Sequence, residues 1–187
     1  MPRIVSGTAK GTTIKVPKSA RPTPDMVREA IFSRLEHRGY LDNTDVLDVY
    51  AGSGAFGLEA ASRGARTVTA VDANREAVST IKANAKKTGL DVLVVNQKAE
   101  AFLGTIGRSY DLIFLDPPYD MAEEALANAI AKAAPLLVHD GLLLVERDKH
   151  SPEPTWPSSL VKDDEKTWGD TVIWSALGAE YARSLDS

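Results

Sequence analysis

The sequence contains no cysteine, which excludes disulfide bonds, thiolate metal sites and a cysteine nucleophile. It also has no run near the roughly 18 consecutive apolar residues that a membrane-spanning helix needs. The first residues, Met1 to Gly7, contain no apolar segment of the signal-peptide kind, so we expect a cytoplasmic protein without membrane contact. The three histidines are scattered without metal-ligand spacing, so no metal site is predicted.

The composition that remains is that of an ordinary globular domain: 187 residues, 43% hydrophobic and 26% charged. The charges are unevenly placed. Residues 1–40 hold 8 Lys and Arg against 3 Asp and Glu, whereas residues 41–187 hold 14 against 23. A basic N-terminal arm on an acidic body favours contact with a polyanion at the N-terminus, although a merely solvated surface would have the same composition. No long apolar stripe stands out, so a monomer is expected.

The N-terminal arm, residues 1–20, is predicted to form a small β-hairpin extension in front of a domain spanning residues 21–187. Two β-branched runs flank a turn-prone stretch that contains two glycines. Directly after the arm, Thr23 is expected to cap a helix that has Pro24 at its first position.

From residue 44 onward, short apolar segments alternate with helix patterns. Strands are predicted at 46–50, 67–71, 92–95, 110–115 and 142–146, with helices at 55–63, 74–89 and 121–134. Two β-type segments then predict a terminal hairpin, at 160–162 and 171–174, and residues 178–187 are expected to be a loose tail. The alternation predicts an α/β fold: a doubly wound, mostly parallel seven-stranded Rossmann-like sheet with an antiparallel C-terminal hairpin.

A glycine-rich loop follows the first predicted strand of this sheet and opens a helix. It reads Gly52-Ser53-Gly54-Ala55-Phe56-Gly57, the context in which glycines let the backbone approach a ligand at a helix N-terminus. Asp72 comes 20 residues after Gly52, at the end of the next strand, where a carboxylate can bind both ribose hydroxyls. The loop and Asp72 alone fit a nicotinamide dinucleotide as well as any other nucleotide.

Two further groups narrow the choice of ligand. Asp48, in the strand before the loop, would repel a pyrophosphate but suits the ammonium group of a methionine moiety. The alternative for Asp48 is a strand-end residue that bonds nearby backbone.

The second group is Asp116-Pro117-Pro118-Tyr119, which follows the fourth predicted strand and should face the glycine loop. Asp116 and the Pro117 carbonyl offer two fixed acceptors for an exocyclic amine, and Tyr119 offers a face for a planar base. The alternative is a proline-rich turn with a surface tyrosine.

Shorter motifs outside these two groups extend the pattern over residues 3–177. They are Arg3-Ile4-Val5-Ser6-Gly7, Lys10-Gly11, Arg21-Pro22-Thr23, Val27-Arg28-Glu29 and Val145-Glu146-Arg147. Together with the glycine loop and Asp116 to Tyr119, the chain resembles the bacterial RsmD family of class I S-adenosylmethionine-dependent methyltransferases. The resemblance implies methyl transfer to the exocyclic N2 of a guanine, nucleotide 966 of 16S ribosomal RNA, in the small subunit or its assembly intermediate.

The resemblance also implies roles for individual residues. The methionine end of S-adenosylmethionine would lie on Asp48, Tyr50, Ala51, Gly52, Ser53 and Gly54; its ribose and adenine on Asp72, Ala73, Lys98 and Ala99. The target amine would lie on the catalytic residues Asp116, Pro117, Pro118 and Tyr119. The RNA would be contacted by Arg3, Lys10, Arg21, Pro22, Thr23 and Arg28.

Three other functions compete with this interpretation. One is an amino-methyltransferase acting on adenine N6 of nucleic acid or on a protein glutamine. A second is a nicotinamide-dependent oxidoreductase, which the glycine loop permits but for which no substrate domain is visible. The third is a non-catalytic RNA-binding protein that retains the fold.

Glu146 and Arg147 are predicted either to border the substrate cleft or to pair with each other.

Overall fold

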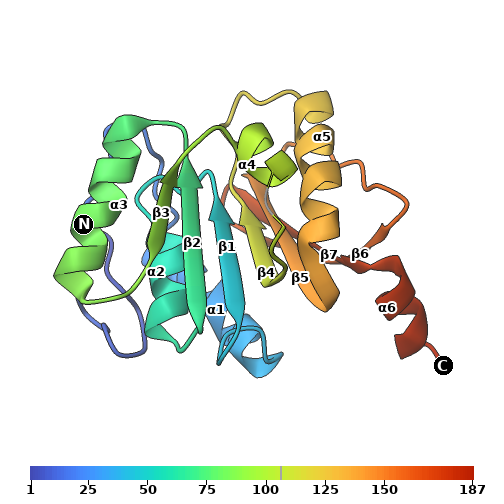
Figure 1. The fold of residues 1–187 in the computed structure, drawn as a ribbon, viewed down its shortest axis with the longest axis horizontal. Helices are drawn as coiled ribbons and strands as arrows, with labels where there is room; N and C mark the ends of the chain where they lie inside the picture. The colour runs from blue at the N-terminus through green and yellow to red at the C-terminus, as the bar shows by residue number, and fades with distance from the viewer. Residues whose placement is uncertain (106) are drawn as a thin grey trace.

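The computed structural model of the protein describes residues 1–105 and 107–187. Seven strands form one central sheet with helices on both faces (Figure 1). The strands are β1 (Asp45–Val49), β2 (Thr67–Asp72), β3 (Leu93–Asn96), β4 (Tyr110–Leu115), β5 (Leu137–Asp148), β6 (Leu160–Trp168) and β7 (Thr171–Gly178). The helices are α1 (Asp25–His37), α2 (Ala55–Ser62), α3 (Arg75–Thr88), α4 (Ala99–Thr105), α5 (Glu123–Ala133) and α6 (Ala179–Leu185), with a short 3-10 turn, η1 (Ala134–Leu136).

The strand order is β3-β2-β1-β4-β5-β7-β6, and the first five strands are parallel. Strand β7 runs antiparallel to both β5 and β6, so the last two strands form a hairpin at the sheet edge. The chain winds outward from β1 in one direction and from β4 in the other, which places a topological switch point between these two strands. The predicted doubly wound sheet with its C-terminal hairpin is confirmed.

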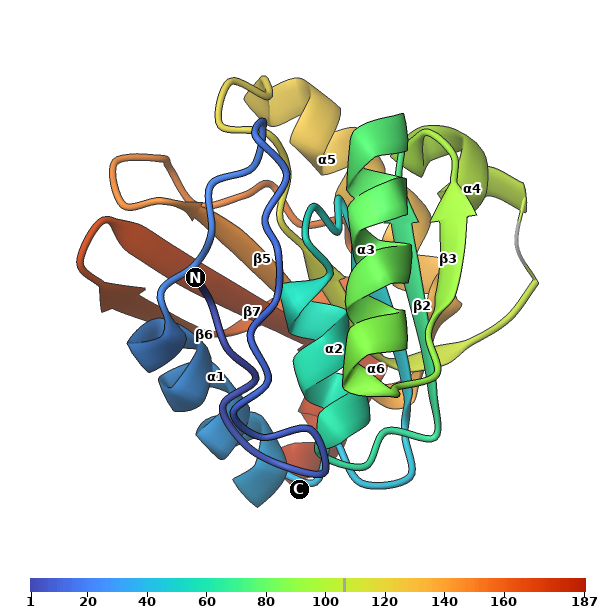
Figure 2. The same cartoon turned by 90° about the vertical axis from the view of Figure 1, so that its left-hand side faces the viewer.

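Both faces of the sheet are covered, which explains why the central strands are almost continuously apolar. Helices α1, α2 and α3 cover one face and helices α4 and α5 the other (Figures 1 and 2). Strand β4 is the centre of both cores: Ile113 packs toward α4 and α5, while Leu112 and Phe114 pack toward α1 and α2.

The N-terminal segment, residues 1–20, lies across α2 between α1 and α3 (Figure 2). Its two arms run antiparallel through one bridge, between Arg3 and Thr13, with a backbone bond from the Ile4 N–H to the Thr12 carbonyl at 2.9 Å. Ile4 and Ile14 are buried in a small apolar cluster that includes Leu58 of α2. The segment is therefore a hairpin-like loop that is held by the helices behind it.

Side chains of α2 bond part of the backbone of this segment. The Glu59 carboxylate accepts hydrogen bonds from the N–H groups of Val5 at 2.8 Å and Ser6 at 3.0 Å. Glu59 is fully buried and also pairs with Arg63 at 3.0 Å. Gly7 has φ +85° and lies so close to α2 that a Cβ there would be 1.9 Å from the Ser62 carbonyl oxygen.

Two local expectations were wrong, and one helix was missed. Residues 178–187 do not form a loose tail, because α6 packs Tyr181 and Ala182 against the apolar cluster beneath α1. Helix α4 was not predicted; it is seven residues long and is held by the buried side chains of Phe102 and Leu103. Thr23 does not cap α1, because its hydroxyl bonds Glu146 instead.

The described residues contain neither a membrane-spanning helix nor a cluster of metal ligands. None of their helices is long and apolar enough to cross a membrane. Within residues 1–105 and 107–187, no cluster of three or more His, Asp or Glu side chains is arranged to hold a metal ion.

Candidate functional site

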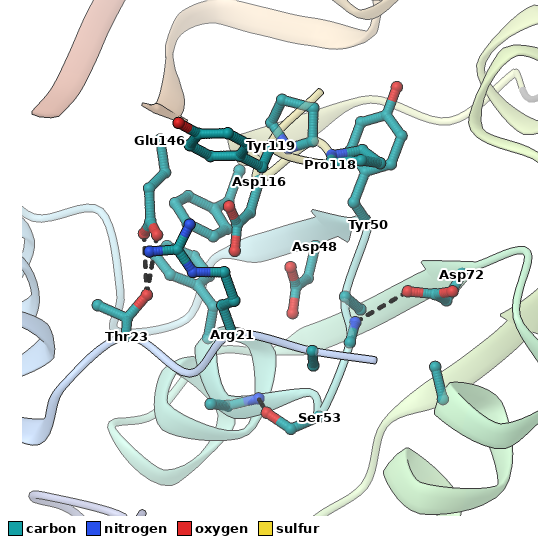
Figure 3. A pocket seen from close by; sticks show the side chains of 18 of the residues that line it. Arg21, Thr23, Asp48, Tyr50, Ser53, Asp72, Asp116, Pro118, Tyr119 and Glu146 are labelled. Atoms are coloured by element: carbon teal, nitrogen blue, oxygen red, sulfur yellow. Dashed lines mark hydrogen bonds between the residues drawn. The ribbon is translucent and has the colours of Figure 1, made fainter. Parts of the chain in front are cut away.

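A cavity of about 670 Å³ opens at the carboxyl ends of β1, β2, β4 and β5, directly over the switch point (Figure 3). This is where doubly wound sheets bind their ligands, because the loops diverge on either side of the switch point. The volume lies within the usual range of about 300–1,000 Å³ for a small-molecule site.

The glycine loop forms one wall of the cavity. Gly52 and Gly54 have φ of +59° and +80°, backbone conformations that favour glycine, and Tyr50 shares this region with φ +60°. The Gly52 N–H donates to the Asp72 carboxylate at 2.9 Å, so β2 fixes the loop. Gly57 brings α2 close to the sheet, since a Cβ there would lie 2.9 Å from Val68.

Asp48 lies at the base of the cavity, almost fully buried, and accepts a hydrogen bond from the Gly57 N–H at 3.0 Å. Burial raises the pKa of Asp48 well above its ordinary value, and the negative charge of Asp72 raises it further. A buried carboxylate with one backbone donor is stabilised by a cation. The base of the cavity therefore favours a positively charged ligand.

Asp116 follows β4 and points into the same cavity (Figure 3). Burial raises the pKa of Asp116 well above its ordinary value, and the neighbouring charges of Glu146 and Asp48 raise it further. Asp48, Asp116 and Glu146 are thus three of the carboxylates that line one cavity. A ligand that brings positive charge or several N–H donors relieves their mutual repulsion.

Tyr119 stands at the mouth of the cavity with 69% of its surface exposed. The Arg21 guanidinium lies 5.3 Å from the centre of its ring, within the range of a cation–π contact. Pro117 is buried, whereas Pro118 is exposed. This stretch therefore presents a flat aromatic face beside the Asp116 carboxylate.

Most of the predicted site residues line this single cavity. From the cofactor set they are Asp48, Tyr50, Ala51, Gly52, Ser53, Asp72, Ala73, Lys98 and Ala99; from the catalytic set, Asp116, Pro117, Pro118 and Tyr119; from the RNA set, Arg21, Pro22, Thr23 and Arg28. Gly54 lies behind the loop, where a Cβ would be 3.0 Å from Ile81. Arg3 and Lys10 are exposed on the N-terminal segment.

Arg28 differs from the other predicted RNA contacts because its side chain is buried inside the protein. It donates to the Arg3 carbonyl at 2.8 Å and pairs with Asp25, so it ties α1 to the N-terminal segment. Its role as an RNA contact stays a prediction.

Glu146 and Arg147 lie near the end of β5: both line the cavity, and each has a different partner. The two oxygens of Glu146 lie 2.9 and 3.1 Å from the Thr23 hydroxyl. Arg147 bonds Glu123 at 2.7 Å and the Met121 carbonyl at 3.2 Å, so it supports the loop after Asp116 from behind. Sequence reasoning left open whether the two residues border the cleft or pair with each other; they border the cavity, and each has another partner.

The cavity fits S-adenosylmethionine by the chemistry of its walls. Asp48 is a buried carboxyl group whose ionised form an ammonium or sulfonium group would stabilise. Asp72 already orients the glycine loop and retains acceptor capacity for ribose hydroxyls. The acceptor Asp116 and the ring of Tyr119 lie on the opposite wall (Figure 3). The cavity thus offers a cofactor side and a substrate side.

The chain is similar to several known proteins. A family model described as "Conserved hypothetical protein 95" matches residues 2–176. The chain is similar to the ribosomal RNA small subunit methyltransferase D of Escherichia coli K12, with 35% identity over 176 residues, 91% of this chain and 86% of that protein. The protein of the same name from Haemophilus influenzae is 33% identical over 176 residues, 89% of each chain. A solved structure of a hypothetical protein from Thermus thermophilus superposes with a TM-score of 0.83 at 34% identity, covering 96% of this chain and 100% of that one.

Proposed function

Because the chain belongs to the RsmD family of small-subunit ribosomal RNA methyltransferases, we propose that it methylates the exocyclic N2 of guanine 966 in 16S ribosomal RNA. The observation that carries the proposal is the cavity itself. It places a buried carboxylate on the cofactor side, and a carboxylate with an exposed aromatic ring on the substrate side.

Bound S-adenosylmethionine supplies an electrophilic methyl group on a positively charged sulfur. The chain's own contribution is to hold the donor and the acceptor nitrogen in line, which can lower a barrier by about 7–11 kcal/mol. Asp48 balances positive charge at the methionine end, and Asp72 binds the ribose hydroxyls. At Gly52 the backbone lines the cavity without a side chain, and Gly54 lets the loop pack closely against Ile81 behind it.

On the substrate side, Asp116 and the Pro117 carbonyl accept hydrogen bonds from the two N–H groups of guanine N2. These hydrogen bonds draw the nitrogen toward tetrahedral geometry and direct its lone pair at the methyl carbon. The N–C bond forms as the C–S bond breaks, and the electron pair of that bond remains on sulfur. Asp116 then accepts the N2 proton; its pKa, which burial raises, makes it a stronger base than an exposed carboxylate.

The target base reaches the cavity unstacked, since the pocket encloses it and Tyr119 stacks on one face. The N-terminal segment, residues 1–20, binds the surrounding RNA through exposed Arg3 and Lys10, beside Arg21 at the cavity mouth. The rest of the chain, residues 21–187, is the methyltransferase domain. The protein acts as a cytoplasmic monomer on the small subunit or its assembly intermediate.

The proposal is tested with the Asp116→Ala variant. We expect methyl transfer to 16S ribosomal RNA to be abolished while S-adenosylhomocysteine binds with near-normal affinity, because Asp116 faces the substrate side. Transfer is measured with labelled cofactor on small subunits, on naked 16S RNA and on DNA, and the modified nucleotide is identified by mass spectrometry. Wild-type activity in the variant, or labelling of DNA alone, would refute the proposal.

A further inference from the structure

Glu146 occupies the position next to Asp116 on the substrate side of the cavity. Strands β4 and β5 are parallel neighbours with Leu115 opposite Val145, and each carboxylate follows directly after its member of this pair. Because the two residues hold equivalent positions on adjacent strands, their side chains leave the sheet on the same face. Figure 3 shows both carboxyl groups pointing into the cavity.

The Glu146 carboxylate is held in one orientation but is not saturated. Thr23 comes from the segment before α1, 123 residues away in sequence, and its hydroxyl lies 2.9 and 3.1 Å from the two oxygens. A hydroxyl donates one hydrogen, so the carboxylate keeps most of its acceptor capacity. Within the part of the chain that the structure describes, this hydroxyl is the one donor that bonds it.

The environment of Glu146 disfavours an unsatisfied charge. Burial raises the pKa of Glu146 above its ordinary value, while the Thr23 hydroxyl and the Arg21 charge act in the opposite direction. Arg147, the next residue, does not neutralise it, because that guanidinium bonds Glu123 and the Met121 carbonyl. A partner with an N–H group would therefore stabilise Glu146 from the cavity side.

We propose that Glu146 determines the choice of base, by accepting the N1–H of the target guanine while Asp116 accepts its N2 amine. The inference rests on the proposed function and assigns a residue to its specificity. On the Watson–Crick edge of guanine, N1–H and the N2 amine are adjacent donors, which match two adjacent carboxylates. Adenine and cytosine present a ring-nitrogen acceptor next to their amine, and its lone pair would face the Glu146 carboxylate.

Thr23 acts through Glu146 as a positioning residue. Its hydroxyl fixes the rotamer of the carboxylate, so that the free lone pairs face the cavity and not the solvent. This role also explains why Thr23 does not cap α1, whose N-cap position is taken by Pro24 without a side-chain bond.

The test uses 2-aminopurine, which carries the same exocyclic amine as guanine but has an N1 acceptor and no N1–H. Small subunits are reconstituted with 16S RNA that holds guanine or 2-aminopurine at the nucleotide that the wild-type protein methylates. We expect the wild type to prefer guanine by at least about 100-fold in kcat/KM, because a buried acceptor rejects an analogue that lacks its donor.

In Glu146→Gln the amide can turn its NH2 toward the N1 acceptor of 2-aminopurine, so the preference should fall to within about 10-fold, chiefly through a faster reaction with 2-aminopurine. Thr23→Val should lower the preference in the same direction, and Thr23→Ser should restore it. Glu180→Gln, on exposed α6, is the matched control and should behave as the wild type.

An unchanged guanine preference in Glu146→Gln, with S-adenosylhomocysteine affinity and melting temperature retained, would overturn the role of Glu146 alone. Equal use of the two bases by the wild type would overturn it as well. A wild-type protein that methylates neither RNA, although it binds S-adenosylhomocysteine, would overturn the proposed function and this inference together.

Discussion

Glu59 is the residue whose loss should most clearly separate the N-terminal segment from the body of the protein. Its fully buried carboxylate accepts the Val5 N–H at 2.8 Å on one oxygen, and the Ser6 N–H and Arg63 Nε on the other, each at 3.0 Å. In Glu59→Gln, an amide NH2 must replace one of these oxygens. In the orientation that costs less, the amide oxygen still accepts hydrogen bonds from Ser6 and Arg63. The amide NH2 then faces the Val5 N–H, so two donors meet and neither has an acceptor.

The expected loss of stability is about 3 kcal/mol. A hydrogen bond to a charged group contributes about 1.5–3 kcal/mol, and a buried donor left without a partner costs about 1–3 kcal/mol more. The loss stays below the upper end of the combined range because Arg63 retains Glu29 at 2.8 Å. The free energy of unfolding from chemical denaturation gives the total, and amide hydrogen exchange at Val5 and Ser6 shows where the structure opens.

Glu29→Gln is the matched control, because it makes the same substitution on another partner of Arg63. The Glu29 side chain is 46% exposed, so its ion pair is screened by water and its loss should change stability by no more than about 1 kcal/mol. Equal losses for the two variants, or unchanged exchange at Val5 in Glu59→Gln, would refute the reasoning from burial.

Two further predictions concern the cavity. Tyr119→Ala should lower kcat/KM for the RNA by about 5- to 150-fold, equivalent to about 1–3 kcal/mol for stacking on one base. Tyr119→Phe keeps the ring and should have near-normal activity. A comparable loss in both variants would point to the hydroxyl and not the ring. Asp116→Asn should become more stable than the wild type as pH rises above the ordinary carboxyl pKa of 3.8. Burial raises the pKa of folded Asp116, so the wild type loses stability between pH 3.8 and that raised pKa. Denaturation at a series of pH values checks this, and parallel curves of stability against pH for the two proteins would contradict it.

The sheet could be predicted from the sequence because its signals are local. Short apolar strands, the helix predicted at 74–89 and the C-terminal hairpin each depend on a few adjacent residues, and the structure has all three. The location of the site followed from a general rule: in parallel sheets, ligands bind at the carboxyl ends of the strands. Asp48, Asp72 and Asp116 could therefore be grouped before any coordinates were known.

The remaining features depend on contacts between distant parts of the chain. Thr23 has the local pattern of a helix cap, yet its hydroxyl bonds a glutamate 123 residues away. The β-branched runs of the N-terminal segment suggested two strands, but much of their backbone is bonded by side chains, as where Asn84 bonds the Lys15 N–H and carbonyl at 2.9 Å each. Local propensity cannot anticipate partners of this kind.

The dependence of the N-terminal segment on α2 and α3 has a consequence for synthesis. The segment leaves the ribosome before the helices that hold it: the carboxylate that bonds Val5 comes 54 residues later and the amide that bonds Lys15 comes 69 residues later. Until α3 has emerged, the nascent arm has only water to satisfy these groups. The segment therefore becomes ordered only after α3 has been made, and it stays open to proteases and chaperones throughout that interval.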